Sequence, residues 1–307
     1  FDYDKGISKS KPEDIELARR TAVHGTHVAG TIGSMFNNEV GIDGVAPKTK
    51  LYGASKYGAD KNEDVENSTI FLIDWLIKNE CKVINISYGY TSSTYKIANG
   101  DADEKEKIQR ETDKIEIALL NHLNNGKDFL IAQSAGNANA GNNADDVEMV
   151  KADWNMFAAI KNPEIANRVI VVGSVGMDGD TYTVSDFSNY GDRVDVVAPG
   201  ELIFSTTYKS ENSKLSNDYE FESGTSMATP HVTGAAAALL SLDPNLTGPE
   251  LKQLLIDTAT KTYRYKDNRF NVKEYPLIDA GAAAQKVLGI DPLDKFKGRW
   301  SVLMREG

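Results

Sequence analysis

The sequence predicts an α/β domain built around a central, mostly parallel β-sheet. Short apolar runs have the length of strands, and stretches with helical periodicity alternate with them. The strand runs lie at 83–86, 129–132, 169–173 and 194–198, and the helical stretches lie at 63–79 and 104–123. The strand runs are apolar at consecutive positions, which is typical of parallel strands buried on both faces. A length of 307 residues, 40% of them hydrophobic, suits one large domain of this class.

The third observation is a run of small apolar residues at 234–240, which has no polar face and therefore predicts a buried helix. The segment before it, 222–232, joins a glycine turn, Ser226 and the start of this helix. Ser226 then lies at a helix N-terminus, where unpaired N–H groups and the helix dipole favour developing negative charge. Pro230 is expected in or near the first turn. The residues at 247–250, Thr-Gly-Pro-Glu, predict a capping box that opens a further helix.

Two histidines, His24 and His27, lie in a segment rich in glycine, alanine and threonine at 23–33. A serine needs a neighbouring base because its hydroxyl is a poor nucleophile at neutral pH. A helix of small residues lets His24 approach the helix of Ser226 closely, and His27 is expected to support the fold or to pack behind His24. Two histidines on one helix face also suit zinc. This alternative is disfavoured, because no glutamate follows His24 and no third ligand stands nearby.

Asn137 follows the apolar strand run at 129–132 and a Ser-Ala-Gly turn. Its amide can donate to an oxyanion from the end of a strand, although asparagine after glycine is also common in ordinary turns. Active sites of parallel α/β sheets gather at the C-terminal ends of the strands. Asn137 and Ser87 both fall at such ends.

The segments around His24, Asn137 and Ser226, taken in this order, closely resemble the subtilisin-like serine proteases, the subtilase family. The resemblance covers most of the chain. It also includes the segments at 44–47, 51–54, 83–89, 185–191, 196–200 and 243–247. It implies a three-layer fold with helices on both faces of the sheet, a peptidase domain at 1–288 and a C-terminal tail at 289–307.

The resemblance implies a serine endopeptidase that forms an acyl-enzyme on Ser226. His24 would be the general base, and Asn137 would be the side-chain donor of the oxyanion hole. Two alternatives are a catalytically silent subtilase-like module that binds peptides and an inactive fragment that lacks the triad aspartate. An esterase would differ from the endopeptidase only in the leaving group.

Further sites follow from the same resemblance. Ser87, Tyr88 and Gly89 correspond to the backbone segment that pairs with the substrate, and Lys56 and Gly58 correspond to the opposite edge of the cleft. Tyr88 stands where many relatives carry leucine, which leaves the pocket shape open. The loop at 35–42 resembles the family's calcium loop, with Asn38 as the side-chain ligand. Structural calcium is therefore expected, and no cofactor is required for the chemistry.

The sequence departs from the family at the triad aspartate, which normally ends an apolar strand and is followed by Ser/Thr-Gly. No such pattern precedes His24, and no upstream carboxylate follows an apolar run. The carboxylates available are Asp2, Asp4, Glu13, Asp14 and Glu16, of which Asp2 and Asp4 remain minor candidates. The triad aspartate and the first core strand are expected upstream of Phe1, in a bound fragment or beside a pro-segment. The sheet edge would then be unpaired.

Two polar insertions, at 91–107 and 138–162, are expected to be solvated surface loops that flank the cleft. Cys81 is the single cysteine, which excludes an internal disulfide, and it is expected to be a small core residue. A net charge of −11 argues against nucleic acids and anionic membranes as partners. A peptide or protein substrate is expected instead. The protein is expected to be secreted or at the cell surface, with an intracellular location left open.

Overall fold

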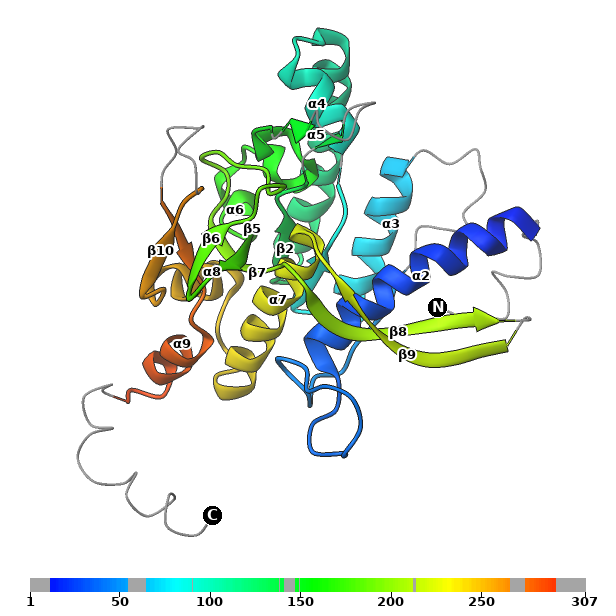
Figure 1. Cartoon of the computed structure of the whole chain (residues 1–307). Coiled ribbons are helices and arrows are strands. Elements are labelled where there is room, and N and C mark those ends of the chain that lie inside the picture. Colours follow the sequence, from blue (N-terminus) through cyan, green and yellow to red (C-terminus); the bar gives the residue numbers. More distant parts are fainter. Residues whose placement is uncertain are drawn as a thin grey trace.

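The computed structural model describes residues 12–54, 65–89, 91–137, 139–140, 147–148, 150–211, 214–265 and 274–290. A central sheet carries helices on both faces, which gives three layers (Figure 1). Along each strand, alternate side chains point to opposite faces, so that one sheet contributes to two apolar cores. The predicted α/β class with a mostly parallel sheet is confirmed. Residues 291–307, which hold most of the expected tail, lie outside the described residues.

The main sheet has the strand order β1-β2-β5-β7-β11-β10, and β6 pairs with β5 beside this path. Pairing is parallel from β1 to β11, whereas β6 and β10 are antiparallel to their neighbours. The strands are β1 (Val83–Ile86), β2 (Leu130–Ser134), β5 (Val169–Asp178), β6 (Thr181–Val184), β7 (Val196–Pro199), β10 (Lys261–Tyr263) and β11 (Tyr275–Leu277). The four predicted strand runs therefore correspond to β1, β2, β5 and β7.

One face of the sheet packs against α3 (Val65–Lys78), α5 (Ala102–Asn124) and α6 (Pro163–Ala166). The other face packs against α7 (Thr225–Leu242), α8 (Gly248–Asp257) and α9 (Ala280–Val287). The run of alanines in α7 lets this helix lie deep in the second core, where Ala228, Ala235 and Ala236 are fully buried. Thr247 and Glu250 form the predicted capping box at the start of α8. Among the described residues, no helix is both long and apolar enough to cross a membrane.

A long helix, α2 (Pro12–Gly33), and a two-stranded ribbon lie beside this core (Figure 1). The ribbon consists of β8 (Ile203–Glu211) and β9 (Lys214–Glu222), which pair antiparallel along their whole length. His27 of α2 is fully buried against this ribbon, and its Nε2 donates to the backbone oxygens of Ile203 at 2.9 Å and Glu220 at 3.1 Å. The hydroxyl of Ser205 donates back to the His27 carbonyl at 2.7 Å. His27 thus fastens α2 to the ribbon, as expected of a residue that supports the fold.

The prediction that 91–107 is a surface loop is wrong. The segment forms α4 (Thr91–Ala98) and the first turn of α5, with a short connection between them. Gly100 turns the chain with a φ of +90°, and Asp101 caps α5 by accepting a hydrogen bond from Glu104 N at 2.9 Å. The segment is a pair of helices joined by a short turn. Its polar composition resembled that of a loop because the turn residues and the cap residue at its centre are also common in loops.

The prediction that 138–162 is a solvated surface loop is wrong for its second half. The segment contains the short strands β3 (Asn139–Ala140) and β4 (Val147–Glu148), and the 3₁₀ helices η2 (Ala152–Trp154) and η3 (Met156–Ala159). The run from Met156 to Ile160 is buried in the first core. These consecutive apolar residues were the feature of the sequence that could have predicted the burial. Cys81 also differs from its prediction, because it is half-buried just before β1 rather than in the core.

Candidate active site

Ser226 is the second residue of α7 and follows the N-cap residue Gly224. Its side chain is half-buried. The hydroxyl donates to the Ser87 carbonyl oxygen at 2.9 Å, and the Ser87 hydroxyl donates to the Ser226 carbonyl oxygen at 2.8 Å. This reciprocal pair joins the start of α7 to the residue that directly follows β1. The serine is therefore held at the C-terminal edge of the sheet.

Pro230 explains why the Ser226 carbonyl bonds to a side chain. In a regular helix, the N–H of residue 230 would donate to the oxygen of residue 226, but proline has no N–H. Pro230 lies inside α7, in its second turn, and not in the first turn as the sequence had suggested. The Ser87 hydroxyl supplies the missing donor. The carbonyl that Pro230 leaves without a helix donor is thus satisfied by the residue that follows β1.

Asn137 follows β2 and lies against the same helix N-terminus. Its Oδ1 accepts hydrogen bonds from the backbone N–H of Thr225 at 2.9 Å and from the Thr225 hydroxyl at 3.0 Å. A Cβ built on Gly224 would lie 3.4 Å from Asn137 Nδ2 and 3.6 Å from the Ser226 amide nitrogen. The two N–H donors therefore border the same space beside Gly224.

His24 lies on α2, whose residues Val28 and Ile32 pack with Met227 of α7. Burial lowers the pKa of the His24 imidazole, the charge of Glu222 raises it and the neighbouring His27 lowers it, and the net shift is downward from 6.5. The ring is therefore neutral at pH 7 and able to accept a proton. Glu222 ends β9, two residues before Gly224, and its position in the sequence had indicated no role.

The structure brings Ser226 and Ser87 into direct contact and joins Asn137 to Thr225, the residue before Ser226. It does not join His24 to Ser226 by a hydrogen bond within the described part of the chain. Among the side chains described, no carboxylate is hydrogen-bonded to His24. The candidates Asp2 and Asp4 lie outside the described residues, and Glu13, Asp14 and Glu16 lie on the first turns of α2. The remaining histidine of the α7 segment, His231, bonds to the Met227 carbonyl at 2.9 Å and is structural.

The expected substrate segment, Ser87 to Gly89, follows β1 at the sheet edge. Two buried amides that sequence reasoning missed hold this segment in place. Gln133 Nε2 donates to the Tyr88 carbonyl at 2.8 Å, and the Asn155 side chain lies against Gly89. In the sequence, the only signal for these two amides was that each polar residue stands among apolar neighbours. Lys56 and Gly58 lie outside the described residues.

The expected calcium loop at 35–42 is exposed, and Asn37, Glu39 and Gly41 all have positive φ. Asn38 Oδ1 accepts a hydrogen bond from Val40 N at 3.1 Å, which leaves a second lone pair on this oxygen. No group of three His, Cys, Asp or Glu side chains that could hold a metal occurs among the described residues. A cation here would therefore depend on backbone carbonyls together with Asn38, which fits calcium better than zinc.

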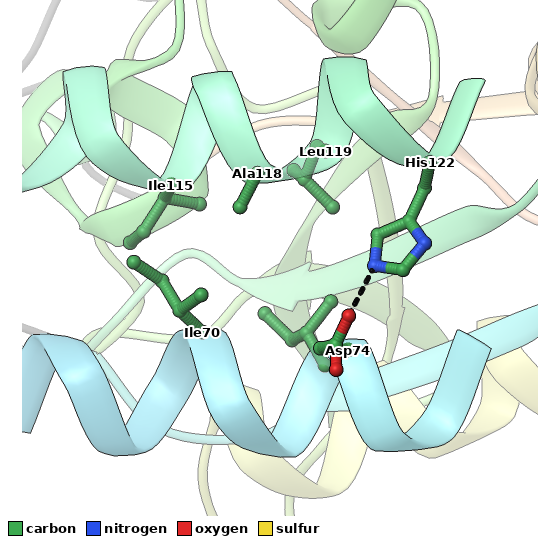
Figure 2. Close-up of a pocket in the computed structure, with 7 residues that line it drawn as sticks. Ile70, Asp74, Ile115, Ala118, Leu119 and His122 are labelled. Atoms are coloured by element: carbon green, nitrogen blue, oxygen red, sulfur yellow. Dashed lines mark ion pairs between the residues drawn. The ribbon is translucent and has the colours of Figure 1, made fainter. Parts of the chain in front are cut away.

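A small pocket lies between α3 and α5 (Figure 2), and Ser226 is not among the residues that line it. His122 Nε2 lies 3.1 Å from Asp74 Oδ1 across it, and Lys78 Nζ lies 2.5 Å from Asp74 Oδ2. The remaining lining is apolar and consists of Ile70, Ile73, Ile115, Ala118 and Leu119. The pair joins two helices on the same face of the sheet and has the character of a structural contact.

Comparison with known proteins decides the family. The model of the subtilase family, peptidase S8, matches residues 2–274. The chain belongs to the subtilase family. It is 33% identical to subtilisin NAT of Bacillus subtilis subsp. natto, over 92% of this chain and 61% of that protein. It is 32% identical to the extracellular basic protease of Dichelobacter nodosus, over 87% of this chain and 39% of that protein.

A solved protease structure from Pseudoalteromonas arctica superimposes on this subtilase with a TM-score of 0.57 and 26% identity, covering 86% of this chain and 70% of that one. The three-layer subtilisin-like fold is thereby confirmed. This subtilase spans between 39% and 61% of the length of the two curated relatives.

Proposed function

We propose that this subtilase is a serine endopeptidase that hydrolyses peptide bonds through an acyl-enzyme on Ser226. One observation carries the proposal. The Ser226 backbone N–H and the Asn137 amide border one space at the N-terminus of α7, directly beside the Ser226 side chain. Two converging N–H donors next to a hydroxyl are the arrangement that acyl transfer requires.

In this proposal, the Ser226 hydroxyl attacks the peptide carbonyl, and His24 takes its proton and later returns it to the leaving amine. The carbonyl oxygen becomes an oxyanion that Asn137 Nδ2 and the Ser226 N–H stabilise. Loss of such a side-chain donor lowers kcat by about 10²–10³, a magnitude that was established by mutation of a subtilisin. The Asn137 amide is in position before the charge forms, because Thr225 already holds its oxygen in place.

The proton transfer requires the Ser226 hydroxyl to leave the Ser87 carbonyl and turn towards α2. In this proposal, rotation about the serine Cα–Cβ bond between staggered positions moves the hydroxyl away from the Ser87 carbonyl. The packing of Val28 and Ile32 on Met227 keeps the two helices adjacent. Burial lowers the pKa of His24, which favours the neutral ring that can accept the proton.

We propose that the carboxylate that orients His24 comes from polypeptide outside the described residues. This polypeptide would be an upstream fragment or a pro-segment. Two observations support this. β1 is an edge strand of the described sheet, with one side open to a further strand. No described carboxylate side chain is hydrogen-bonded to His24, although the charge of Glu222 acts on it.

The substrate is proposed to be a peptide or protein that binds extended along Ser87, Tyr88 and Gly89, by adding a strand next to these residues. Structural calcium is proposed at the loop 35–42 with Asn38 as a ligand, because the Asn38 oxygen retains a free lone pair. A secreted or cell-surface location is proposed from the relative that is named an extracellular protease.

Labelling of the full-length protein with a serine-directed peptidyl phosphonate tests the endopeptidase proposal. The wild type is expected to incorporate the label and to lose peptide cleavage in proportion, whereas Ser226→Ala incorporates none. Peptide binding without labelling or cleavage would contradict the proposal and support the silent peptide-binding module. Turnover of esters without cleavage of peptides would instead indicate an esterase.

A further inference from the structure

We propose that Asn155 restricts the substrate residue on the acyl side of the scissile bond, called P1, to small side chains. The inference rests on the proposed endopeptidase function and specifies its substrate class. Asn155 lies between η2 and η3, in the segment that the sequence had presented as a surface insertion. Its side chain is 1% exposed, which places an amide deep beside the candidate site.

Two backbone segments border the space next to Ser226. The first is Ser87 to Gly89 after β1, and the second is Ser134 to Gly136, which ends β2 and leads to Asn137. β1 and β2 are adjacent parallel strands, so the two segments leave the sheet side by side. In this proposal, the side chain of an acyl group on Ser226 enters between these two segments when the acyl oxygen faces Asn137. The width of this gap determines which P1 residues fit.

The amide of Asn155 occupies the gap. Its Nδ2 donates to the Ser134 carbonyl oxygen at 2.8 Å. A Cβ built on Gly89 would lie 2.0 Å from Asn155 Oδ1, and one built on Gly136 would lie 3.3 Å from Asn155 Nδ2. The amide thus touches both walls, and a bulky P1 side chain cannot enter without displacing it.

Displacement of Asn155 is resisted because the walls are held by buried amides. Gln133, which is fully buried, donates through Nε2 to the Tyr88 carbonyl at 2.8 Å and to the Ser134 carbonyl at 3.0 Å. Asn189 also holds the second segment, donating to the Ala135 carbonyl at 3.3 Å, and a Cβ built on Gly136 would lie 2.7 Å from its Nδ2. Buried backbone groups that lose a partner are costly, so the gap stays narrow.

The test uses two peptidyl diphenyl phosphonates that differ only at P1, with alanine or phenylalanine. The rate constant for labelling of Ser226 is measured with each, on the full-length protein. The wild type is expected to react at least about 10-fold faster with the alanine probe, and Asn155→Ala is expected to shift this ratio towards phenylalanine by at least about 10-fold.

Two variants distinguish an effect of the space that the Asn155 side chain fills from a general disturbance of the structure. Asn155→Leu removes the hydrogen bond to Ser134 but keeps the gap filled, so it is expected to retain the preference for alanine. Asn189→Ala removes the hydrogen bond to Ala135 but leaves Asn155 in place, so it is expected to change both rates by the same factor.

A wild-type preference for the phenylalanine probe would overturn the inference, even if Asn155→Ala fails to fold. Equal ratios for Asn155→Ala and Asn155→Leu would also overturn it. If neither probe labels Ser226 in the wild type, the endopeptidase proposal itself is contradicted and this inference falls with it.

Discussion

His24 owes its chemical character to its neighbours. A charged imidazolium loses hydration when it is buried, so burial lowers the pKa of His24, and the electrostatic effect of the neighbouring His27 acts in the same direction. The negative charge of Glu222 stabilises the imidazolium and opposes both effects. The sum favours the neutral ring, which is the form that a general base must have.

The pH dependence of kcat/KM should report this balance. Activity is expected to rise with pH as His24 loses its proton. Glu222→Gln removes the charge that raises the pKa, so the midpoint is expected to move to lower pH. The exposed Glu220 on the same strand provides the control, because Glu220→Gln should leave the midpoint unchanged. A shift to higher pH in Glu222→Gln would contradict this assignment.

At the scale of elements, the site depends on contacts between segments that are far apart in the chain. Pro230 removes a helix donor and Ser87 replaces it, which fixes α7 against the end of β1. His27 fastens α2 to the β8–β9 ribbon through two backbone oxygens. The residues Glu222 to Ser226 lead directly from this ribbon into α7, so the same contact positions His24 relative to Ser226.

Replacement of His27 should therefore loosen the site as well as the fold. His27→Leu fills the space but leaves the carbonyl oxygens of Ile203 and Glu220 without their donor. It is expected to lower the free energy of unfolding by about 1–3 kcal/mol, measured by urea denaturation. His27→Gln retains a donor of similar reach and should recover part of the loss. Equal stability of the wild type and His27→Leu would show that these bonds do not hold the ribbon.

At the scale of the whole molecule, the sheet separates two cores and gathers the candidate groups at one edge. Ser87 and Asn137 follow adjacent parallel strands, and α7 crosses their ends with Ser226 in its first turn. The open side of β1 is where the described sheet can accept another strand. The exposed loop at 35–42, with Met35 68% exposed, contributes little apolar burial of its own. Bound calcium would supply the order that packing does not.

Removal of calcium is therefore expected to lower the melting temperature. Any ligand that binds the folded state stabilises it, by about 2.7 kcal/mol when its concentration is 100 times Kd. Thermal unfolding in excess calcium and in excess chelator should differ by several degrees, and Asn38→Ala should reduce this difference. Identical melting curves in the two conditions would exclude a stabilising calcium site in this protein.

The sequence predicted much of this arrangement because the signals were local. Consecutive apolar residues identified β1, β2, β5 and β7, and Thr247 with Glu250 identified the start of α8. The two insertions were misjudged for a physical reason. Composition shows whether a segment is polar, but not whether its caps close a helix, as Asp101 does, or whether its apolar residues reach the core, as Phe157 does.

By itself, the sequence determined the class of fold, the family and the three side chains proposed for the chemistry, because each depends on residue types in fixed local order. The tertiary structure alone decided which groups touch. It placed Ser87 on Ser226, Glu222 near His24 and Asn155 between the strand ends. Contacts of this kind join residues that are distant in the chain, and they are set by how helices and strands pack.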